Sequence, residues 1–174
     1  MDGYLTLFTP LHRRLYRKAV DIRGSEIHDF LGDLFGERLA RHNVEMVQTP
    51  SFAKTTITAY PSSFYPVFVN LVDNAIYWLS VQGEQVERRI TLDAKDDIFR
   101  VCDTGPGIHR RDRDDIFEYG FTRKPGGQGM GLHISRQALR SVGYDLTLAD
   151  RKAPRGAMFL IAPRRKDEGK RDAD

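Results

Sequence analysis

The stretch Asn70-Leu71-Val72-Asp73-Asn74-Ala75 decides how this chain is interpreted, together with Asp103-Thr104-Gly105-Pro106-Gly107 further along. A third motif, Gly127-Gln128-Gly129-Met130-Gly131-Leu132, follows the second. Together they describe a helix that holds a metal, an acidic residue on a glycine turn, and a glycine-rich phosphate loop that opens another helix. This combination predicts a nucleotide-binding site.

The first motif lies on a helix that we expect from about residue 64 to residue 81. Asn70, Asn74 and Tyr77 share one face of it because they are four and three residues apart, and Tyr77 is therefore also a candidate nucleotide-binding residue. Asparagine is a poor helix former, and its carboxamide oxygen is a hard neutral ligand that suits Mg²⁺. Two surface asparagines are the alternative, but the other motifs favour Asn74 as a metal ligand. The predicted buried stripe is Phe68, Leu71, Val72, Ala75 and Leu79.

The second motif places Asp103 at the end of a predicted strand, residues 99–103. A carboxylate there can accept a hydrogen bond from the exocyclic amine of adenine, which guanine lacks at that position. Gly105 and Gly107 allow the backbone to approach a flat ligand closely. The alternative is an ordinary turn, because Asp, Gly and Pro are common turn residues. Beside the other motifs, Asp103 predicts recognition of ATP.

The third motif opens a helix expected over residues 131–142, and helix N-termini attract phosphate through free N–H groups. It is neither a dinucleotide fingerprint nor a Walker loop, since no Gly-Lys-Ser/Thr follows. Upstream we expect a mobile lid that is anchored by Phe117 and Phe121. The lid brings cations to the phosphates, although its charges could simply be solvated. The candidate nucleotide-binding residues of the lid and loop are Thr122, Arg123, Lys124, Gly127, Gln128, Gly129, Met130, Gly131 and Leu132.

The remaining pattern predicts an α/β fold, a two-layer sandwich in which three helices cover one face of a mixed β-sheet. A further helix is expected over residues 25–42, capped by Ser25, and a short helical turn around residues 114–118. Strands are expected at 44–48, 55–59, 90–94, 99–103, 146–149 and 157–161. We assign residues 1–24 to an arm or linker, 25–163 to the nucleotide-binding domain, and 164–174 to a charged flexible tail.

Composition fits one domain of 174 residues with 40% hydrophobic residues. No apolar run is long enough to span a membrane, and Cys102 is the only cysteine, so we expect a cytoplasmic protein without membrane contact. The net charge of +3 comes largely from basic clusters at residues 13–18 and 164–171. Nothing in these clusters has a nucleic-acid recognition pattern, so we interpret them as a solvated arm and tail.

In order and spacing, the three motifs and the phenylalanines between them resemble the GHKL superfamily, which unites gyrase, heat-shock ATPase chaperones, histidine kinases and mismatch-repair ATPases. The resemblance is strong over residues 64–162 and covers 20–59 by layout only. It implies a Bergerat-type ATP-binding fold with ATP and Mg²⁺ as cofactors. By this similarity Asn74 binds Mg²⁺, Asn70 and Lys124 are catalytic, and Asp103 recognises adenine. The glycines at 105 and 107 then shape the adenine pocket, and those at 127, 129 and 131 bind phosphate through backbone amides.

One position separates the branches of this superfamily. Hydrolysing members place a glutamate, the general base for water, one turn before the metal-binding asparagine, and here that residue is Asn70, whose amide cannot abstract a proton. With its Asn-x-x-x-Asn motif, this chain resembles the catalytic domain of sensor histidine kinases. The resemblance implies an ATP-dependent protein histidine kinase of two-component signalling. Its partners would be a histidine phosphoacceptor domain, in the same longer chain or in trans, and a downstream response regulator.

Two departures from the kinase pattern stand out. Kinases often carry Lys and then Tyr where this chain has Tyr77 and Trp78, so a phosphate-binding cation is missing unless Lys124 or Arg123 replaces it. Gly156-Ala157 stands where Gly-Thr is usual. The alternatives are an ATP-gated regulatory module without efficient phosphotransfer, a GHKL ATPase, and a serine-directed kinase. We interpret His28, although Asp29 follows it, as structural, and we expect the isolated chain to be monomeric.

Overall fold

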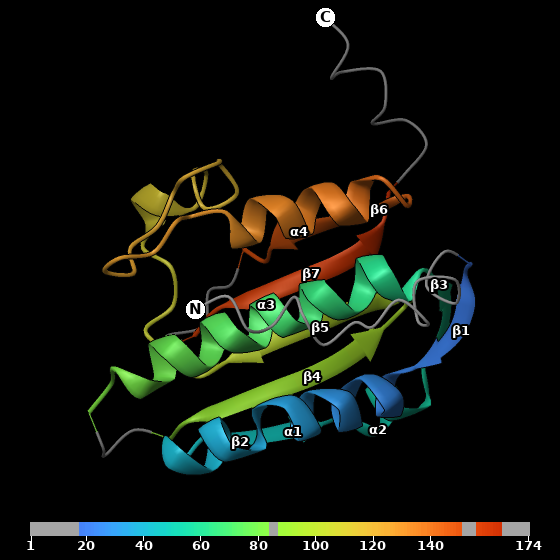
Figure 1. Ribbon diagram of the computed structural model, residues 1–174, viewed down its shortest axis with the longest axis horizontal. Coiled ribbons are helices and arrows are strands. Elements are labelled where there is room, and N and C mark those ends of the chain that lie inside the picture. Colours follow the sequence, from blue (N-terminus) through green and yellow to red (C-terminus); the bar gives the residue numbers. More distant parts are fainter. Residues whose placement is uncertain (1–17, 84–86, 151–155, 165–174) are drawn as a thin grey trace, which may run out of the picture.

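We describe a computed structural model of the protein, which covers residues 18–83, 87–150 and 156–164 (Figure 1). Its helices are α1 (Gly24–Arg41), α2 (Pro50–Lys54), α3 (Pro61–Ser80) and α4 (Gly131–Arg140), with a short 3-10 helix η2 (Arg110–Asp112). Its strands are β1 (Val20–Arg23), β2 (Glu45–Gln48), β3 (Thr56–Ala59), β4 (Arg89–Lys95), β5 (Ile98–Asp103), β6 (Tyr144–Leu148) and β7 (Met158–Pro163).

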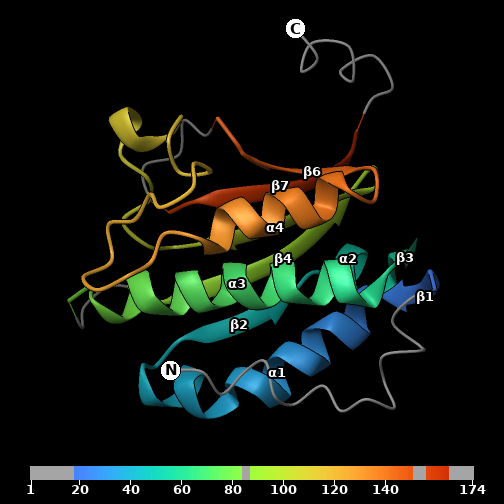
Figure 2. The same ribbon diagram turned by 45° about the horizontal axis from the view of Figure 1, so that its top comes forward.

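A five-stranded sheet in the order β2-β4-β5-β7-β6 forms one layer. The β2–β4 pair is parallel and the other pairs are antiparallel, so the sheet is mixed. Residues of β4 alternate between buried and half-buried, as expected for a sheet with one covered face. Figures 1 and 2 show α1, α3 and α4 side by side on that face. The predicted two-layer sandwich with three covering helices is confirmed.

The central helix α3 packs the helical layer against the sheet. Its predicted stripe from Phe68 to Leu79 is buried, and Phe68 meets Phe52 of α2 and Phe99 of β5 edge to face, at centroid distances of 6.1 and 6.0 Å. The helix begins at Pro61, earlier than predicted, because Pro61 suits the first helical position. Pro66 therefore lies inside the helix, beyond its first turn.

The N-terminal half contains two elements that the sequence analysis did not predict. Strand β1 lies in the stretch assigned to an arm, and pairs with β3 in a separate two-stranded sheet. Helix α2 is a single turn capped by the Thr49 hydroxyl. Helix α1 begins directly after Arg23 rather than after a Ser25 cap. The 3-10 helix η2 lies just before the helical turn expected at residues 114–118, where the Ile116 N–H donates to the Asp112 carbonyl and the Glu118 N–H to the Asp115 carbonyl. The rest of the predicted arm (1–17) and tail (165–174) lies outside the described residues.

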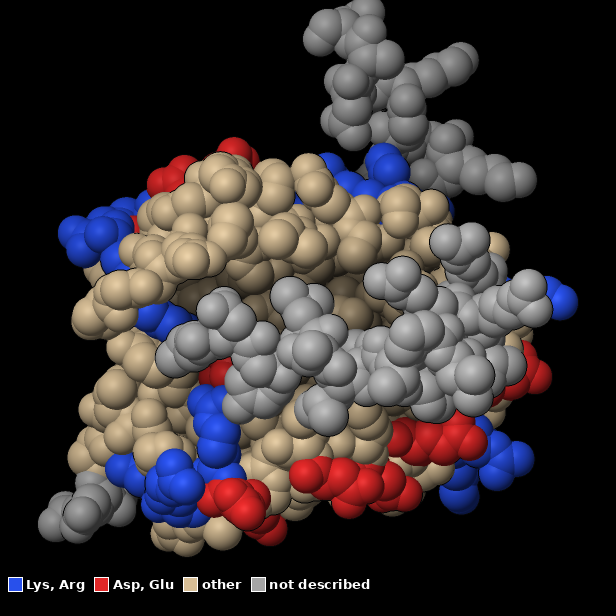
Figure 3. Space-filling view, viewed as in Figure 1, with Lys and Arg blue, Asp and Glu red and all other residues tan. Residues whose placement is uncertain are grey.

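Charge along α1 follows the direction of its dipole. Glu26 lies in the first turn, whereas Arg38 and Arg41 lie in the last, and both placements favour the helix. Acidic and basic side chains are interspersed along the edge of the face in Figure 3 where α1 lies. Among the described residues, no helix combines the length and apolarity needed to cross a membrane. Arg38 also reaches α3, which links this outer helix to the central one.

An ion-pair cluster fastens α4 to β6. Asp145 accepts hydrogen bonds from Nε of Arg136 at 2.9 Å and from Nε of Arg140 at 3.1 Å. Burial alone would raise the pKa of Asp145, but the hydrogen bonds from Arg140 and Arg136 outweigh it and lower that pKa to about 2. A carboxylate whose pKa falls on folding stabilises the protein above its unfolded-state pKa and loses this contribution as the pH falls.

We therefore predict that Asp145→Asn lowers the free energy of unfolding at pH 7 by about 1–2 kcal/mol. The difference from wild type should shrink by about half at pH 3, between the unfolded pKa near 4 and the folded value. Urea unfolding followed by circular dichroism at several pH values measures it. Asp114→Asn, at an exposed position, is the control and should change little. A pH-independent difference for Asp145→Asn would contradict this account of the cluster.

Candidate nucleotide-binding site

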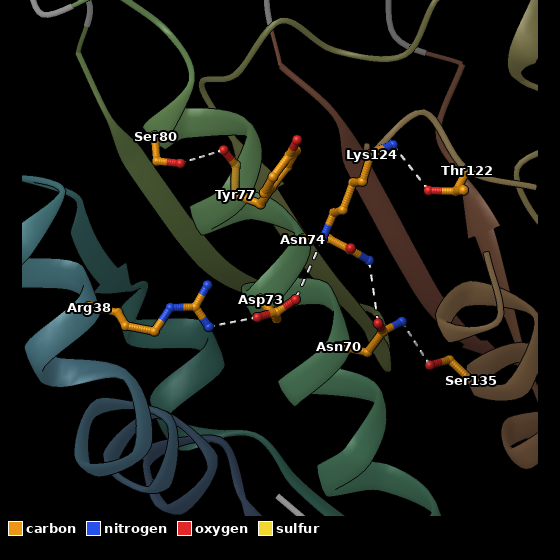
Figure 4. Close-up of polar contacts among 9 residues, drawn as sticks. All are labelled: Arg38, Asn70, Asp73, Asn74, Tyr77, Ser80, Thr122, Lys124 and Ser135. Carbon is orange, nitrogen blue, oxygen red and sulfur yellow. Dashed lines mark hydrogen bonds and ion pairs between the residues drawn. The ribbon is translucent and has the colours of Figure 1, made fainter. Parts of the chain in front are cut away.

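The two asparagines of the first motif lie where α3 faces α4. Asn70 donates from Nδ2 to the Ser135 hydroxyl of α4 at 3.1 Å, and Asn74 donates from Nδ2 to Oδ1 of Asn70 at 3.4 Å (Figure 4). The α4 helix comes close to Asn70 because its first residue is glycine: a Cβ on Gly131 would lie 2.4 Å from Oδ1 of Asn70. The first and third motifs therefore meet in space, and both asparagines are half-buried at the contact.

The second motif forms a tight turn that is fixed by its own aspartate. Oδ1 of Asp103 accepts from the backbone N–H of Gly105 at 2.8 Å and of Ala157 at 3.2 Å. A Cβ on Gly156, which has a φ of +83°, would lie 1.8 Å from the Asp103 carbonyl oxygen, so only glycine fits there. Gly107 also has a positive φ and packs against Gly156. The Asp103 carboxylate is thus fixed at the end of β5 by backbone N–H groups. This close packing of the backbone requires glycine at position 156, where a side chain would clash.

The glycine-rich loop is braced against the lid that precedes it. The Thr122 hydroxyl accepts from the backbone N–H of Lys124 at 3.1 Å, and the Gly127 N–H donates to the Lys124 carbonyl at 2.9 Å. Gly129 has a positive φ, and a Cβ there would lie 2.3 Å from the Gly120 carbonyl carbon. The glycine-rich loop therefore depends on glycine for close backbone contact.

The two cations of the lid point in different directions. Lys124 is half-buried and reaches α3, where its Nζ lies 3.5 Å from Oδ2 of Asp73 and 4.7 Å from the centre of the Tyr77 ring. Burial lowers the pKa of Lys124, and the Asp73 carboxylate opposes this. Arg123 instead pairs with Asp112 through two hydrogen bonds of 2.6 and 3.2 Å. Of the two predicted phosphate contacts, only Lys124 is directed toward the asparagines.

Of the other predicted residues, some lie at the candidate site and others pack in the hydrophobic core. Phe117 is buried against Phe159, and Phe121 packs on the core. Gln128 is exposed, and Met130 is half-buried just before α4. Leu132 packs against the hydrophobic core. His133 of α4 has its Nδ1 3.0 Å from the Phe117 carbonyl oxygen.

Four further residues belong to this network although the sequence analysis did not single them out: Arg38, Asp73, Asp112 and Ser135. Asp73 is part of the first motif, and Ser135 lies one turn after Gly131, so their positions hinted at a role. Arg38 and Asp112 are far from the motifs in sequence, and only the packing of α1 and the fold of the lid bring them near.

Residues 59–167 match the sequence model of the family described as histidine kinase-, DNA gyrase B- and HSP90-like ATPase. This match spans more than half of the chain, and the protein belongs to this family. Among solved structures, it is similar to the catalytic domain of the histidine kinase ThkA, with a TM-score of 0.67, 26% identity, and coverage of 84% of this chain and 95% of that one. A mycobacterial sensor histidine kinase, MprB, gives a TM-score of 0.65 at 25% identity, covering 84% and 99%.

Curated relatives point to the same branch. The sensor protein ChvG of Rhizobium meliloti is 33% identical over 100 residues, which are 54% of this chain and 17% of that protein. The adaptive-response sensory kinase SasA of Crocosphaera subtropica is 30% identical over 129 residues, 72% of this chain and 34% of that protein. The chain thus matches about a third or less of the length of these two relatives. The resemblance to an ATP-binding domain of the histidine kinase type is confirmed.

We predict that Gly131→Ala weakens binding of an ATP analogue about tenfold with little change in stability. The new methyl group must displace the Asn70 side chain, which can turn away by giving up its hydrogen bonds to Ser135 and Asn74, rather than the backbone. Calorimetric titration and thermal unfolding measure the two effects. Gly36→Ala, in α1 with no atom within 4 Å of the added Cβ, is the matched control and should raise stability by about 0.5–1 kcal/mol without changing affinity. Unchanged affinity in Gly131→Ala would contradict the site.

Proposed function

We propose that this domain binds Mg-ATP and donates its γ-phosphate to a histidine on a separate phosphoacceptor domain, in two-component signalling. The single observation that carries the proposal is the meeting of Asn70 on α3 with Gly131 at the start of α4. This contact brings a pair of hard oxygen donors next to a helix N-terminus with free N–H groups. Membership of the histidine kinase-like ATPase family supports the same conclusion.

The donor set fits the implied ligands. The Asn74 carboxamide is half-buried beside Asn70 and offers a neutral oxygen, which suits an ion that takes its other ligands from phosphate and water. Asp103, oriented by two backbone N–H groups, would accept from the exocyclic amine of adenine. The loop glycines would present backbone N–H groups to phosphate oxygens, and Lys124 would add a charge. When bound, Mg²⁺ would neutralise charge that develops on the phosphates.

The roles of these residues favour transfer over hydrolysis. Asn70 is held by the Ser135 hydroxyl and cannot act as a general base toward water. Phosphoryl transfer requires mainly positioning and electrostatic stabilisation, which a rigid pair of helices can supply. The nucleophile would then come from outside the site, as a histidine nitrogen of the partner domain.

His28 does not resemble such an acceptor. It lies on α1, within the catalytic domain itself, and its Nδ1 is 3.3 Å from the Asp29 carboxylate. The acceptor histidine would therefore belong to a helical domain in a longer chain or in another protein, and a response regulator would take the phosphoryl group from it.

One observation favours a second candidate function, an ATP-gated regulatory module. Tyr77 and Trp78 occupy the positions of the usual Lys and Tyr, and their rings pack edge to face at 5.1 Å, so α3 itself brings no cation to the phosphates. Incubation with labelled ATP and isolated phosphoacceptor domains separates the two functions. Transfer to a histidine supports the kinase, whereas tight ATP binding with no transfer to any acceptor favours the module.

We predict that the chain binds a non-hydrolysable ATP analogue in a Mg²⁺-dependent manner and discriminates against the GTP counterpart. Asn74→Ala should remove the Mg²⁺ dependence. Asp103→Asn should reduce the preference for adenine by about tenfold, because a neutral amide replaces the charged acceptor of a hydrogen bond worth about 1.5–3 kcal/mol. Calorimetric titration measures both. Asp150→Asn, the same change at a side chain that is 99% exposed, is the control. Normal Mg²⁺-dependent binding by Asn74→Ala would show that the metal site is wrongly assigned.

A further inference from the structure

Asp73 connects three elements that are distant in sequence. Its Oδ1 accepts from Nη1 of Arg38 on α1 at 2.6 Å, and its Oδ2 lies 3.5 Å from Nζ of Lys124 in the lid. Figure 4 shows Asp73 between these two cations, with the Lys124 side chain extending over Asn74. Asp73 is part of the first motif, but neither metal binding nor adenine recognition uses it.

Lys124 is the cation on which the proposed function depends, and it sits on a loop rather than on a helix. A lysine side chain has four rotatable bonds, and fixing it costs conformational entropy. In this structure the Lys124 amine is already fixed between the Asp73 carboxylate and the face of the Tyr77 ring, and 22% of its side chain is exposed. Tyr77 stands where kinases of this type carry lysine, so the lid lysine occupies the side of α3 that lacks its own cation.

We propose that Asp73, held by Arg38, is a positioning residue that keeps Lys124 over the first motif, ready to contact the phosphates of ATP. This inference rests on the proposed function, since it assumes that ATP binds there. The carboxylate has two oxygens and uses one for each cation, so the Arg38 guanidinium fixes the direction in which the other oxygen points.

The charges of the three side chains support positioning over simple neutralisation. Two cations and one carboxylate carry a net charge of +1, so phosphate would still meet an attractive centre. Arg38 is itself restrained by the Phe35 ring, 5.5 Å from its guanidinium carbon. A surface ion pair of this kind contributes little to stability alone, so the function of the contact is the placement of Lys124 rather than the strength of the fold.

The direction in which Asp73→Asn changes ATP affinity distinguishes positioning of Lys124 from plain electrostatics. Asp73→Asn removes a negative charge near the triphosphate, and if charge alone mattered, ATP would bind more tightly. If Asp73 positions Lys124, ATP binds more weakly, because the lysine must be ordered during binding. AMP lacks the terminal phosphates, so its affinity should not change in either case.

The experiment is calorimetric titration of the wild-type chain and its variants with Mg-bound ATP analogue and with AMP. We expect Lys124→Gln to weaken ATP binding about tenfold and Asp73→Asn about three- to fivefold, with AMP unaffected. Asp73→Glu should restore affinity to within about twofold of wild type, and Asp73→Asn should cause no further loss in the Lys124→Gln background. Glu45→Gln is the matched control, since it also removes one carboxylate from an arginine pair and lies away from α3.

Two results would overturn the inference while leaving the proposed function intact. One is wild-type or tighter ATP binding by Asp73→Asn when Lys124→Gln is impaired. The other is an equal loss of ATP and AMP affinity in Asp73→Asn, which would indicate a general structural defect. Failure of the wild-type chain to bind either nucleotide would overturn both proposals, and thermal unfolding of each variant confirms that the proteins compared are folded.

Discussion

The burial of one side of α3 is the constraint on which the rest of the structure depends. Phe68 locks this helix to α2 and β5 through edge-to-face ring contacts, and the whole stripe around it is excluded from water. A helix so fixed cannot rotate, so the residues of its other side have defined positions. Asn70 and Asn74 are placed opposite α4 by hydrophobic packing, and the polar site needs little flexibility of its own.

The fold could largely be predicted because its long elements have strong periodic patterns. The stripe of α3 and the alternation of β4 each identify a buried face from local sequence alone. The sequence failed where structure depends on distant partners. Strand β1 has four residues, of which only Ile22 is buried, and it exists because β3 pairs with it. Helix α2 is a single turn whose capping hydroxyl also bonds to Asp93, far along the chain.

The candidate site likewise has features that the sequence predicts and features that it does not. The three motifs could be read from the sequence because each places special residue types at a fixed local spacing. Their meeting could not, since it depends on the absence of a side chain at Gly131 and on the register of α3 against α4. The sequence offered both Arg123 and Lys124 as phosphate-binding cations, and only the family resemblance favoured Lys124. The structure separates them because Asp112, on η2, engages the guanidinium through two hydrogen bonds and leaves only the lysine directed toward α3.

Because only Lys124 is directed toward α3, this site can lack the usual lysine on the helix and have a cation on the lid instead. A lysine on α3 would be held by the helix, whereas a lysine on the lid depends on contacts that form only when the lid is folded. Tyr77 supplies one such contact, because its ring face attracts the ammonium group of Lys124. Tyr77 itself has no charge, although it stands where kinases of this type carry lysine. Asp73 supplies the second, and Arg38 extends the network to α1. The tyrosine on the helix and the cation on the lid are therefore parts of one arrangement, in which contacts with Asp73 and Tyr77 place the charge of Lys124 over the first motif.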